Sequence, residues 1–318
     1  MSLCLVTGGA GFIGSHLVRR LLAEGHAVRV LDNFSTGHAA NLAEVAGDIE
    51  LVEGDIGDEH AAARCASGAD TVFHLAARAS VPRSVEFPVE ANHANVTGTL
   101  ILLVAAREAG VRRFVYSASS AAYGDTPTLP KVESMPPQPL SPYAVSKLAA
   151  EYYCSCFSHV YGLETISLRY FNIFGPRQDP RSAYAAAIPA FVSRMIRGER
   201  PVIYGDGEQS RDFCYVDNAV EANVLAMRAP RLSGEVVNIA CGERITLNAI
   251  VALINQHLGS RLTPVYEPVR PGDVRHSLAA LDAAQRTIGY RPGVMFAEGL
   301  ARSLAWYRDS ATRQATGS

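Results

Sequence analysis

Apolar residues in the first half of the chain occur in short runs that alternate with longer segments of helical periodicity. The short runs predict five strands, at Leu3–Val6, Ala27–Leu31, Thr71–Leu75, Phe114–Ser117 and Thr165–Leu168. The periodic segments between them predict three helices, at Phe12–Ala23, Val89–Ala109 and Tyr143–Val160. Strands that are apolar on both faces and linked by helices form parallel sheets that helices cover on both sides. The pattern therefore predicts an α/β fold built on a doubly wound parallel sheet.

The pattern becomes less regular from about Gly175, where prolines separate shorter elements. Residues 1–174 are therefore predicted to form the larger domain, and residues 175–309 a smaller α/β domain built against its sheet. The segment at roughly 211–240 is expected to return to the larger domain. The polar stretch 310–318 is expected to fray as a tail.

Composition and charge describe a globular protein and narrow the classes of partner. Hydrophobic residues make up 48% of the 318 positions and charged residues 19%, which predicts a packed core rather than disorder. A formal net charge of −2 supplies no electrostatic reason to bind nucleic acid or a membrane surface. The longest apolar run, Leu100–Ala106, is far shorter than the roughly 20 residues that span a bilayer.

The cysteines and the start of the chain indicate a cytoplasmic protein with reduced thiols. Cys154 and Cys156 are separated by one residue on a predicted helix, which is neither zinc-ligand nor redox spacing. No cluster of His, Asp, Glu or Cys has ligand spacing in the sequence, so no metal is predicted. A predicted strand begins at Leu3 without a preceding basic region, so no signal peptide is expected.

A glycine-rich segment joins the first predicted strand to the first predicted helix. Gly8, Gly11 and Gly14 permit a tight turn and close backbone approach, and the helix N-terminus offers free N–H groups to a pyrophosphate. A turn without a ligand is the alternative, but the strand before it and the helix after it favour a Rossmann-type dinucleotide site. Asp32, at the end of the second strand, suits the adenosine ribose and would repel a 2′-phosphate, which favours NAD over NADP. Asp55 is expected either to reach the adenine or to cap a helix.

A second group of residues has the chemistry of proton transfer. Ser141 and Pro142 are typical of a helix start, which places Tyr143 and Lys147 four residues apart on one helix face. A nearby ammonium and a cationic nicotinamide ring would lower the pKa of the tyrosine by about 3 units, enough to make it a base near neutral pH. Ser119, just after the strand Phe114–Ser117, is placed to hydrogen-bond the same substrate oxygen.

These residues and their neighbours resemble an extended short-chain dehydrogenase/reductase, and more closely its UDP-hexose 4-epimerases of the N-acetylglucosamine type. The resemblance covers Leu3 to about Tyr307, nearly the whole chain. The first half carries the glycine loop, His74-Leu75-Ala76-Ala77, Asn95 with Gly98-Thr99, Ser119 before Tyr123-Gly124, and the Tyr143/Lys147 pair. The second half carries Leu168 to Asn172, Gly205-Asp206-Gly207, Ser210-Arg211-Asp212-Phe213 and Arg270-Pro271-Gly272-Asp273.

The resemblance implies a redox-neutral reaction on tightly held NAD, through a transient 4-keto sugar. It implies that Tyr143 takes the O4 proton, that Ser119 orients O4, and that Lys147 binds the nicotinamide ribose. The implied NAD-binding residues are Gly8, Gly11, Phe12, Ile13, Gly14, Asp32, Asn33, Asp55, Ile56, Leu75, Ala76, Ala77, Asn95, Ser117, Tyr143, Lys147 and Tyr170. The implied UDP-sugar-binding residues are Ala79, Ser119, Tyr143, Asn172, Ala186, Ile188, Tyr204, Arg211, Arg270, Asp273 and Ser277. The larger domain would then bind NAD and the smaller one the UDP-sugar.

Residues around the implied sugar pocket narrow the substrate. The run from Ser120 to Tyr123 lacks the acid that dehydratases and decarboxylases of this branch carry, and Asn172 stands where uronate 4-epimerases usually have threonine. Ser277 replaces the bulky tyrosine of glucose-restricted enzymes, and Ala79 and Ala186 are also small. The favoured pair is therefore UDP-N-acetylglucosamine and UDP-N-acetylgalactosamine, with UDP-glucose and UDP-galactose as a slower second pair.

Other functions remain as alternatives. A 4-epimerase acting mainly on UDP-glucose or a UDP-uronic acid would use the same machinery. A non-catalytic NAD-sensing protein would not need Ser119, Tyr143 and Lys147, and a net dehydrogenase would release NADH. His74 is expected to pack or hydrogen-bond near the cofactor rather than to catalyse. The resemblance also implies a homodimer through helices Val89–Ala109 and Tyr143–Val160.

Overall fold

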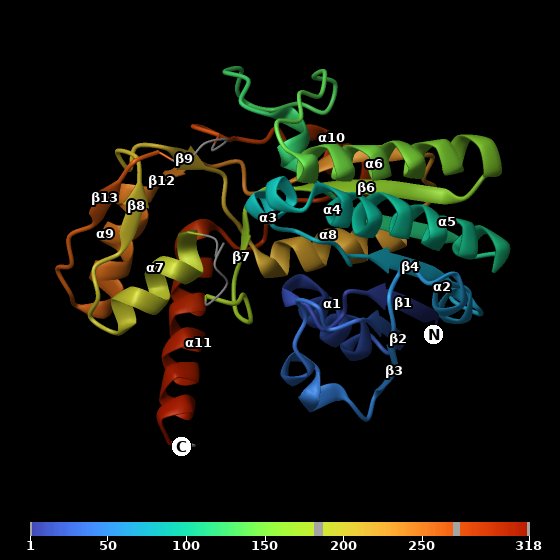
Figure 1. Ribbon diagram of the computed structural model, residues 1–318, viewed down its shortest axis with the longest axis horizontal. Helices are drawn as coiled ribbons and strands as arrows, with labels where there is room; N and C mark the ends of the chain where they lie inside the picture. The colour runs from blue at the N-terminus through green and yellow to red at the C-terminus, as the bar shows by residue number, and fades with distance from the viewer. Residues whose placement is uncertain (1, 181–186, 270–273, 317–318) are drawn as a thin grey trace.

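A parallel sheet of seven strands is the centre of the computed structural model, which describes residues 2–180, 187–269 and 274–316 (Figure 1). The strands follow the spatial order β11-β6-β5-β4-β1-β2-β3, and every neighbouring pair is parallel. In that order they are Glu235–Ile239, Glu164–Tyr170, Arg113–Ser119, Thr71–His74, Leu3–Thr7, Ala27–Asp32 and Ile49–Glu53. The chain reverses its direction of winding between β1 and β4, which is where open α/β sheets bind ligands.

Both faces of this sheet are buried under helices. Successive strand residues point to opposite sides, so each strand contributes side chains to two cores. In β1, Cys4 and Val6 pack into one apolar core and Leu5 into another. The second core lies under α2 (Glu59–Ala66), α5 (Gly98–Glu108) and α6 (Pro142–Tyr161). The first lies under α1 (Phe12–Ala23) and α8 (Val216–Arg228). The prediction of a doubly wound sheet of the Rossmann type is confirmed.

The predicted helix Val89–Ala109 is three consecutive segments in the structure. They are α4 (Pro88–Asn92), a π-helical turn η3 (His93–Thr97), and α5. A π turn inserts extra backbone into a helix and is frequent at functional sites. Here the turn carries Asn95, whose side chain is buried.

Residues 173–316 supply the remaining helices and small sheets, and within the described residues they return to the main sheet through α8 and β11 and again through α10 (Asp282–Ile288), which packs against β11. α8 packs against α1, and β11 completes the sheet edge beside β6. Of the other elements, α10 lies beside α6 in Figure 1, and most of the rest gather at the left of the picture, around α7, α9 and α11. Their bounds are β7 (Ile173–Phe174), α7 (Ala187–Ile196), β8 (Val202–Tyr204), β9 (Ser210–Arg211), β10 (Cys214–Tyr215), β12 (Ile245–Thr246), α9 (Leu247–Leu258), β13 (Val265–Glu267), α10 (Asp282–Ile288) and α11 (Phe296–Thr316). The last helix continues past Ser310, where the sequence predicts a polar tail.

Short helices occupy several connections near the carboxyl edge of the sheet. They are η1 (Ala39–Asn41), η2 (Ala43–Val45), α3 (Val81–Glu86) and η4 (Ser120–Tyr123). None of the helices in the described ranges has the length and apolar content that crossing a membrane requires.

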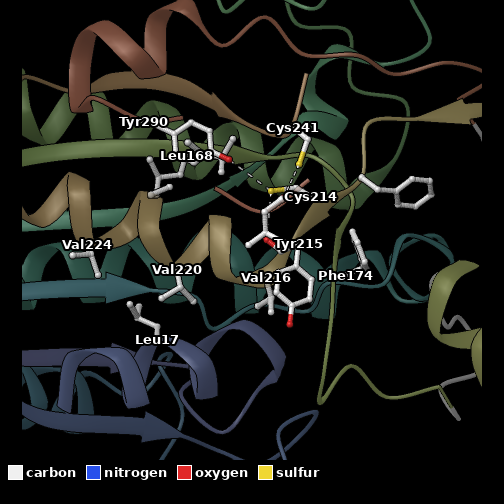
Figure 2. Close-up of a cluster of buried hydrophobic side chains, with 14 of the residues drawn as sticks. Leu17, Leu168, Phe174, Cys214, Tyr215, Val216, Val220, Val224, Cys241 and Tyr290 are labelled. Carbon is white, nitrogen blue, oxygen red and sulfur yellow. Dashed lines mark hydrogen bonds between the residues drawn. The ribbon is translucent and has the colours of Figure 1, made fainter. Parts of the chain in front are cut away.

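The two parts of the molecule share one core where β6 meets α8. Figure 2 shows Leu168 of β6 and Val220 of α8 close to Cys214, Cys241 and Tyr290. All five side chains are buried. The elements that follow β7 are therefore packed against the sheet through a shared apolar core, and this core fixes their position relative to the sheet.

Candidate active site

The glycine loop after β1 is shaped by contacts that leave no room for side chains. Gly8 has φ +70°, and a Cβ there would lie 2.7 Å from the backbone nitrogen of Ala76. A Cβ on Gly14 would lie 2.2 Å from the carbonyl oxygen of Gly8. Gly11 is the N-cap of α1 and provides no side-chain cap, so the first N–H groups of that helix remain available. The loop is therefore a cradle for an anion at a helix N-terminus.

Asp32 and Asp55 stand at the ends of neighbouring strands beside this loop. The Asp32 carboxylate accepts the backbone N–H groups of Ala10 and Phe34, each at 2.9 Å. Burial raises the pKa of Asp32, and these two hydrogen bonds oppose the shift. Asp55 accepts the side-chain amide of Asn33 at 2.6 Å. The cap of α2 is Asp58, so the cap proposed for Asp55 is not used there.

The proton-transfer residues come from β5 and the first turns of α6. Ser141 caps α6 by accepting the N–H of Ala144 at 3.2 Å, and Pro142 occupies the first turn. Lys147 is buried and Tyr143 is half-buried, and the Ser119 side chain at the end of β5 lies close enough to the Tyr143 hydroxyl to act on its pKa. The lysine ammonium lies 4.5 Å from the centre of the Tyr116 ring. The sequence therefore places these three side chains correctly on the strand end and the helix start.

The sequence expectation for the tyrosine pKa includes a bound cationic nicotinamide, and the protein alone shows what burial contributes without it. Burial raises the pKa of Tyr143, and the hydrogen bond with Ser119 opposes that change. Burial also lowers the pKa of Lys147 to about 7, so its charge is only partly retained at neutral pH. Within the protein alone, desolvation outweighs the predicted lowering of the tyrosine pKa, because both groups are removed from water.

Behind the site, His74 is the centre of a buried hydrogen-bond chain. Its Nδ1 lies 2.7 Å from the Thr7 hydroxyl, and its Nε2 lies 2.8 Å from the Thr99 hydroxyl. The Thr99 hydroxyl donates to the Asn95 carbonyl at 2.6 Å, so it accepts from Nε2–H, and Thr7 then donates to Nδ1. Burial lowers the pKa of His74 to about 3, which keeps the ring neutral. This chain ties β1, β4 and the π turn together.

The side-chain amide of Asn95 also fixes the backbone next to the site. Its oxygen accepts the backbone N–H of Arg78 at 2.7 Å. Its nitrogen donates to the Arg78 carbonyl at 3.1 Å and to the Ser146 hydroxyl at 2.9 Å. Asn95 thus connects α6 to the segment after β4, one layer behind the surface predicted to touch the cofactor.

Residues far apart in the sequence converge on the opposite wall. Asn172 has φ +32°, a backbone conformation unusual for a residue other than glycine. Its amide nitrogen donates to the carbonyl of Asp212 at 3.1 Å and to the hydroxyl of Ser277 at 3.3 Å. Arg211, next to Asp212, donates to the carbonyls of Ser210 and Arg275. Three separate segments are therefore held together here by side-chain hydrogen bonds.

The glycine loop, the Ser119, Tyr143 and Lys147 group, and the wall with Asn172 all line one cavity of about 1060 Å³. Ligand pockets usually enclose roughly 300–1,000 Å³, so this cavity is at the upper end of that range. The predicted site residues that line it are Gly8, Gly11, Phe12, Ile13, Gly14, Asp32, Asn33, Asp55, Ile56, Leu75, Ala76, Ala77, Ala79, Ser117, Ser119, Tyr143, Lys147, Tyr170, Asn172, Arg211 and Ser277. Asn95, Ile188 and Tyr204 are not in the lining, and Ala186, Arg270 and Asp273 lie outside the described residues.

One wall of the cavity was missed by the sequence reasoning. Arg78, Val81 and Glu90, which come from the segment after β4 and from helices α3 and α4, line the cavity. Ser80 caps α3 by accepting the N–H of Arg83 at 3.2 Å. A serine followed at once by an apolar residue and a proline is a helix-start signal that would have predicted α3. Among the described residues, no group of three His, Cys, Asp or Glu side chains is arranged to hold a metal ion.

Comparisons with known proteins agree with this geometry. The family model "NAD dependent epimerase/dehydratase family" matches residues 4–240. The UDP-glucose 4-epimerase of Mycolicibacterium smegmatis is 39% identical over 309 residues, which is 96% of this chain and 98% of that protein.

Two solved structures share the fold over nearly their full length. One is a UDP-glucose 4-epimerase from Thermotoga maritima with UDP-glucose. The other is a UDP-N-acetylglucosamine 4-epimerase from Methanobrevibacter ruminantium in complex with UDP-N-acetylmuramic acid. Each is 40% identical with a TM-score of 0.93, and each comparison covers 97% of this chain and 99% of the other.

Proposed function

The chain belongs to the NAD dependent epimerase/dehydratase family, and from this premise we propose that it interconverts UDP-N-acetylglucosamine and UDP-N-acetylgalactosamine at C4. It is an NAD-dependent UDP-sugar 4-epimerase. One observation carries the assignment of the chemistry: the glycine cradle and the Ser119, Tyr143 and Lys147 side chains line a single cavity. UDP-glucose and UDP-galactose are proposed as a slower second pair.

The residues present fit NAD. The backbone-lined cradle at the N-terminus of α1 suits a pyrophosphate, and a Cβ on Gly8 or Gly14 would fill it. Asp32, held by two backbone N–H groups, is proposed to receive the adenosine ribose hydroxyls, and Asp55 to lie near the adenine. When bound, NAD supplies a reversible hydride acceptor for the sugar carbon. Lys147 is proposed to hold the nicotinamide ribose.

Tyr143 is proposed as the group that takes the proton from O4 of the sugar and later gives it back. Its hydroxyl lies within hydrogen-bond reach of Ser119, so a substrate oxygen bound there would contact both groups. Because burial raises the tyrosine pKa within the chain, its ionisation depends on positive charge brought near it. Lys147, one helical turn away on α6, is the side chain that supplies part of that charge.

The opposite wall is proposed to hold the UDP. The guanidinium of Arg211 lines the cavity and is suited to a diphosphate oxygen. Asn172, fixed by two hydrogen bonds from its amide nitrogen, is proposed to contact the same diphosphate. Arg270 and Asp273 remain predictions from the sequence resemblance.

The size of the sugar end supports the N-acetylated pair. Ala79 and Ser277, which line the cavity, are both small. A pocket that admits a 2-acetamido group also admits the smaller hydroxyl and discriminates against it only weakly. This is why UDP-glucose is proposed as a second substrate and not excluded.

A homodimer is proposed through the helices that cover one face of the sheet. α3, α4 and α6 pack against one another. Their outer surface carries exposed apolar side chains, among them Val85 at 64%, Val89 at 81% and Tyr152 at 57% exposure. A second copy of the chain would cover this surface. Light scattering of the wild type and of Val89→Glu tests the proposal, with a dimer expected for the first and a monomer for the second.

The substrate proposal is tested by incubating the purified protein, without added cofactor, with three UDP-sugars in separate reactions. UDP-N-acetylglucosamine, UDP-glucose and UDP-glucuronic acid are the substrates, and NMR of the anomeric proton resolves the products. Fastest conversion of UDP-N-acetylglucosamine is expected. Turnover of only UDP-glucose or only the uronate would overturn the sugar assignment and leave the reaction type intact. Stoichiometric release of NADH would instead identify a net dehydrogenase.

A further inference from the structure

We infer that Asp212 is a positioning residue for the UDP-sugar wall: its ionised carboxylate holds Asn172 and Ser277 in place, and substrate binding weakens when it takes up a proton. This inference rests on the proposed function, since it assigns the wall to the UDP-sugar. Asp212 follows Arg211 at the end of β9 and is fully buried. It is not in the lining of the cavity, so it acts through its neighbours.

The Asp212 carboxylate accepts hydrogen bonds from three backbone N–H groups of two distant segments. One oxygen accepts from Cys241 at 2.9 Å. The other accepts from Gly242 at 3.0 Å and from Ala279 at 3.1 Å. The loop after β11 and the segment that carries Ser277 are therefore both fastened to the same side chain.

The backbone of Asp212 continues the connection to the cavity surface. Its carbonyl accepts the amide of Asn172 at 3.1 Å, and its N–H lies 3.4 Å from the hydroxyl of Ser277. The N–H of Ser277 in turn donates to the carbonyl of Ser210 at 3.1 Å. Because Asn172 also occupies a strained backbone conformation, its position depends on these partners.

Protonation would disturb this arrangement, because three donors already share two oxygens. A carboxyl group that gains a proton acquires a donor where one of the N–H groups now points. Displacement of the N–H of Ala279 or Gly242 would loosen the segment that bears Ser277 or the loop after β11. The result would be a change of binding geometry at the wall without a change in the cofactor cradle.

The surroundings explain why such a proton is taken up near physiological pH. Burial raises the pKa of Asp212 to about 6, the three N–H groups oppose the shift, and the negative charge of Glu243 adds to it. Cys214 and Tyr290, which Figure 2 shows in contact with each other, are the other titratable groups on which the Asp212 charge acts. Burial raises the pKa of both groups well above the usual value, so they stay neutral around pH 6.

The sign of the linkage separates this effect from unfolding. An acid whose pKa is higher in the folded state than in the unfolded state binds its proton more tightly when folded. Lowering the pH through 6 therefore stabilises the fold through Asp212 rather than destabilising it. A loss of substrate affinity that follows Asp212 in this range would therefore come from the site and not from unfolding driven by Asp212.

Calorimetric binding of UDP-N-acetylglucosamine to the NAD-loaded protein between pH 5 and 8 tests the inference. The Tyr143→Phe background prevents turnover, and a sugar-linked diphosphate lacks the phosphomonoester group that titrates near pH 6. The dissociation constant is expected to rise about tenfold on acidification, with a midpoint near 6, which is the factor of one charge-assisted hydrogen bond. In Asp212→Asn the affinity should already be about tenfold weaker at pH 7.5 and nearly independent of pH.

His276→Gln is the matched control, because His276 contacts Ser210, the residue before Arg211, at 2.8 Å and does not contact the Asp212 carboxylate. This variant should still show the rise of the dissociation constant at low pH. The inference would be overturned if the dissociation constant did not rise on acidification in His276→Gln or in the wild type. It would also be overturned if the rise persisted in Asp212→Asn. Retained NAD and the thermal midpoint, measured at each pH, show whether a variant is folded. The UDP-sugar incubations test the proposed function separately, and failure to bind either UDP-N-acetylglucosamine or UDP-glucose at any pH would overturn both.

Discussion

The cavity has a cofactor wall, which is the glycine loop and strand ends proposed to hold NAD, and a substrate wall, which is the group of segments around Asn172 proposed to hold the UDP-sugar. The two walls are built in different ways. The cofactor wall consists of strand ends of one sheet and a helix N-terminus, so each predicted contact lies within a few residues of a regular element. The substrate wall joins Asn172, Asp212 and Ser277, which are separated by up to 105 residues and held by single side-chain hydrogen bonds. The first wall is fixed by the backbone hydrogen bonds between the parallel strands that carry it. The second can respond to one substitution or one proton, which suits a surface that selects among similar sugars.

Replacing Tyr143 by phenylalanine should have the largest effect, and on chemistry alone. The variant loses the hydroxyl that exchanges the O4 proton, so kcat should fall about 10³-fold. UDP-sugar affinity should change little, because the other contacts of both walls remain. The rate is measured by NMR and the affinity by calorimetry.

Tyr152→Phe is the matched control for that change, since Tyr152 lies on the same helix but is 57% exposed. It should keep the wild-type rate. Turnover retained in Tyr143→Phe would refute the assigned role, and an equal loss in both variants would indicate damage to α6.

Replacing Gly14 by alanine should break the cofactor wall. The new Cβ would lie 2.2 Å from the carbonyl oxygen of Gly8, so the cradle must shift. Overpacking of this kind costs about 1–3 kcal/mol and should reduce NAD retained after purification. NAD is measured by absorbance of the denatured extract.

Gly47→Ala is the comparison for this variant, because a Cβ there meets nothing within 4 Å. It should retain wild-type NAD. A Gly14→Ala protein with full NAD content would show that the loop tolerates a side chain and that the cradle is assigned wrongly.

The difference between the walls also explains what the sequence could predict. The glycine loop, Asp32, Ser119 and the Tyr143/Lys147 pair are local signals: each depends on a strand end or a helix start that apolar periodicity already places. The doubly wound parallel sheet follows from the same alternation and is confirmed, whereas the order of its seven strands is given by the structure.

Tertiary features were less accessible from the sequence. The role of Asp212 depends on N–H groups of Cys241 and Ala279, which no local pattern brings together. The π turn in the predicted helix Val89–Ala109 has no signal in apolar spacing. The effect of burial on the pKa of Tyr143 in the protein alone was not accessible from the sequence, because desolvation depends on what surrounds the side chain, whereas a sequence shows only its charged neighbours.

Replacing His74 by leucine should weaken the fold on the cofactor side and leave sugar selectivity unchanged. The Thr7 hydroxyl loses its buried acceptor and the Thr99 hydroxyl loses the donor it accepts from. The free energy of unfolding should fall by about 1–3 kcal/mol at pH 7.5, measured by urea denaturation.

The pH dependence of stability gives a second readout for His74. Its pKa is about 3 in the fold, so the unfolded chain binds the proton first as the pH falls below about 6.5. The wild type should therefore lose stability on acidification, and His74→Leu should lose less. His60→Gln, at an exposed histidine, should leave both quantities unchanged. An acid dependence identical to that of the wild type in His74→Leu would contradict the neutral, hydrogen-bonded ring.

Replacing Ser277 by tyrosine should give the smallest change in overall rate and the most informative one, because it acts on selectivity at the substrate wall. The phenol must enter the cavity beside Asn172, where the 2-acetamido group is proposed to lie. The ratio of kcat/KM for UDP-N-acetylglucosamine to that for UDP-glucose should fall about tenfold. Ser277→Ala removes the same hydrogen bond to Asn172 without adding volume, so it should lower both values together and keep their ratio. If Ser277→Ala shifts the ratio of kcat/KM values as far as Ser277→Tyr does, selectivity comes from the position of Asn172 and not from the space at residue 277. The substrate wall would then differ from the cofactor wall in its hydrogen bonds and not in the room it leaves for the sugar.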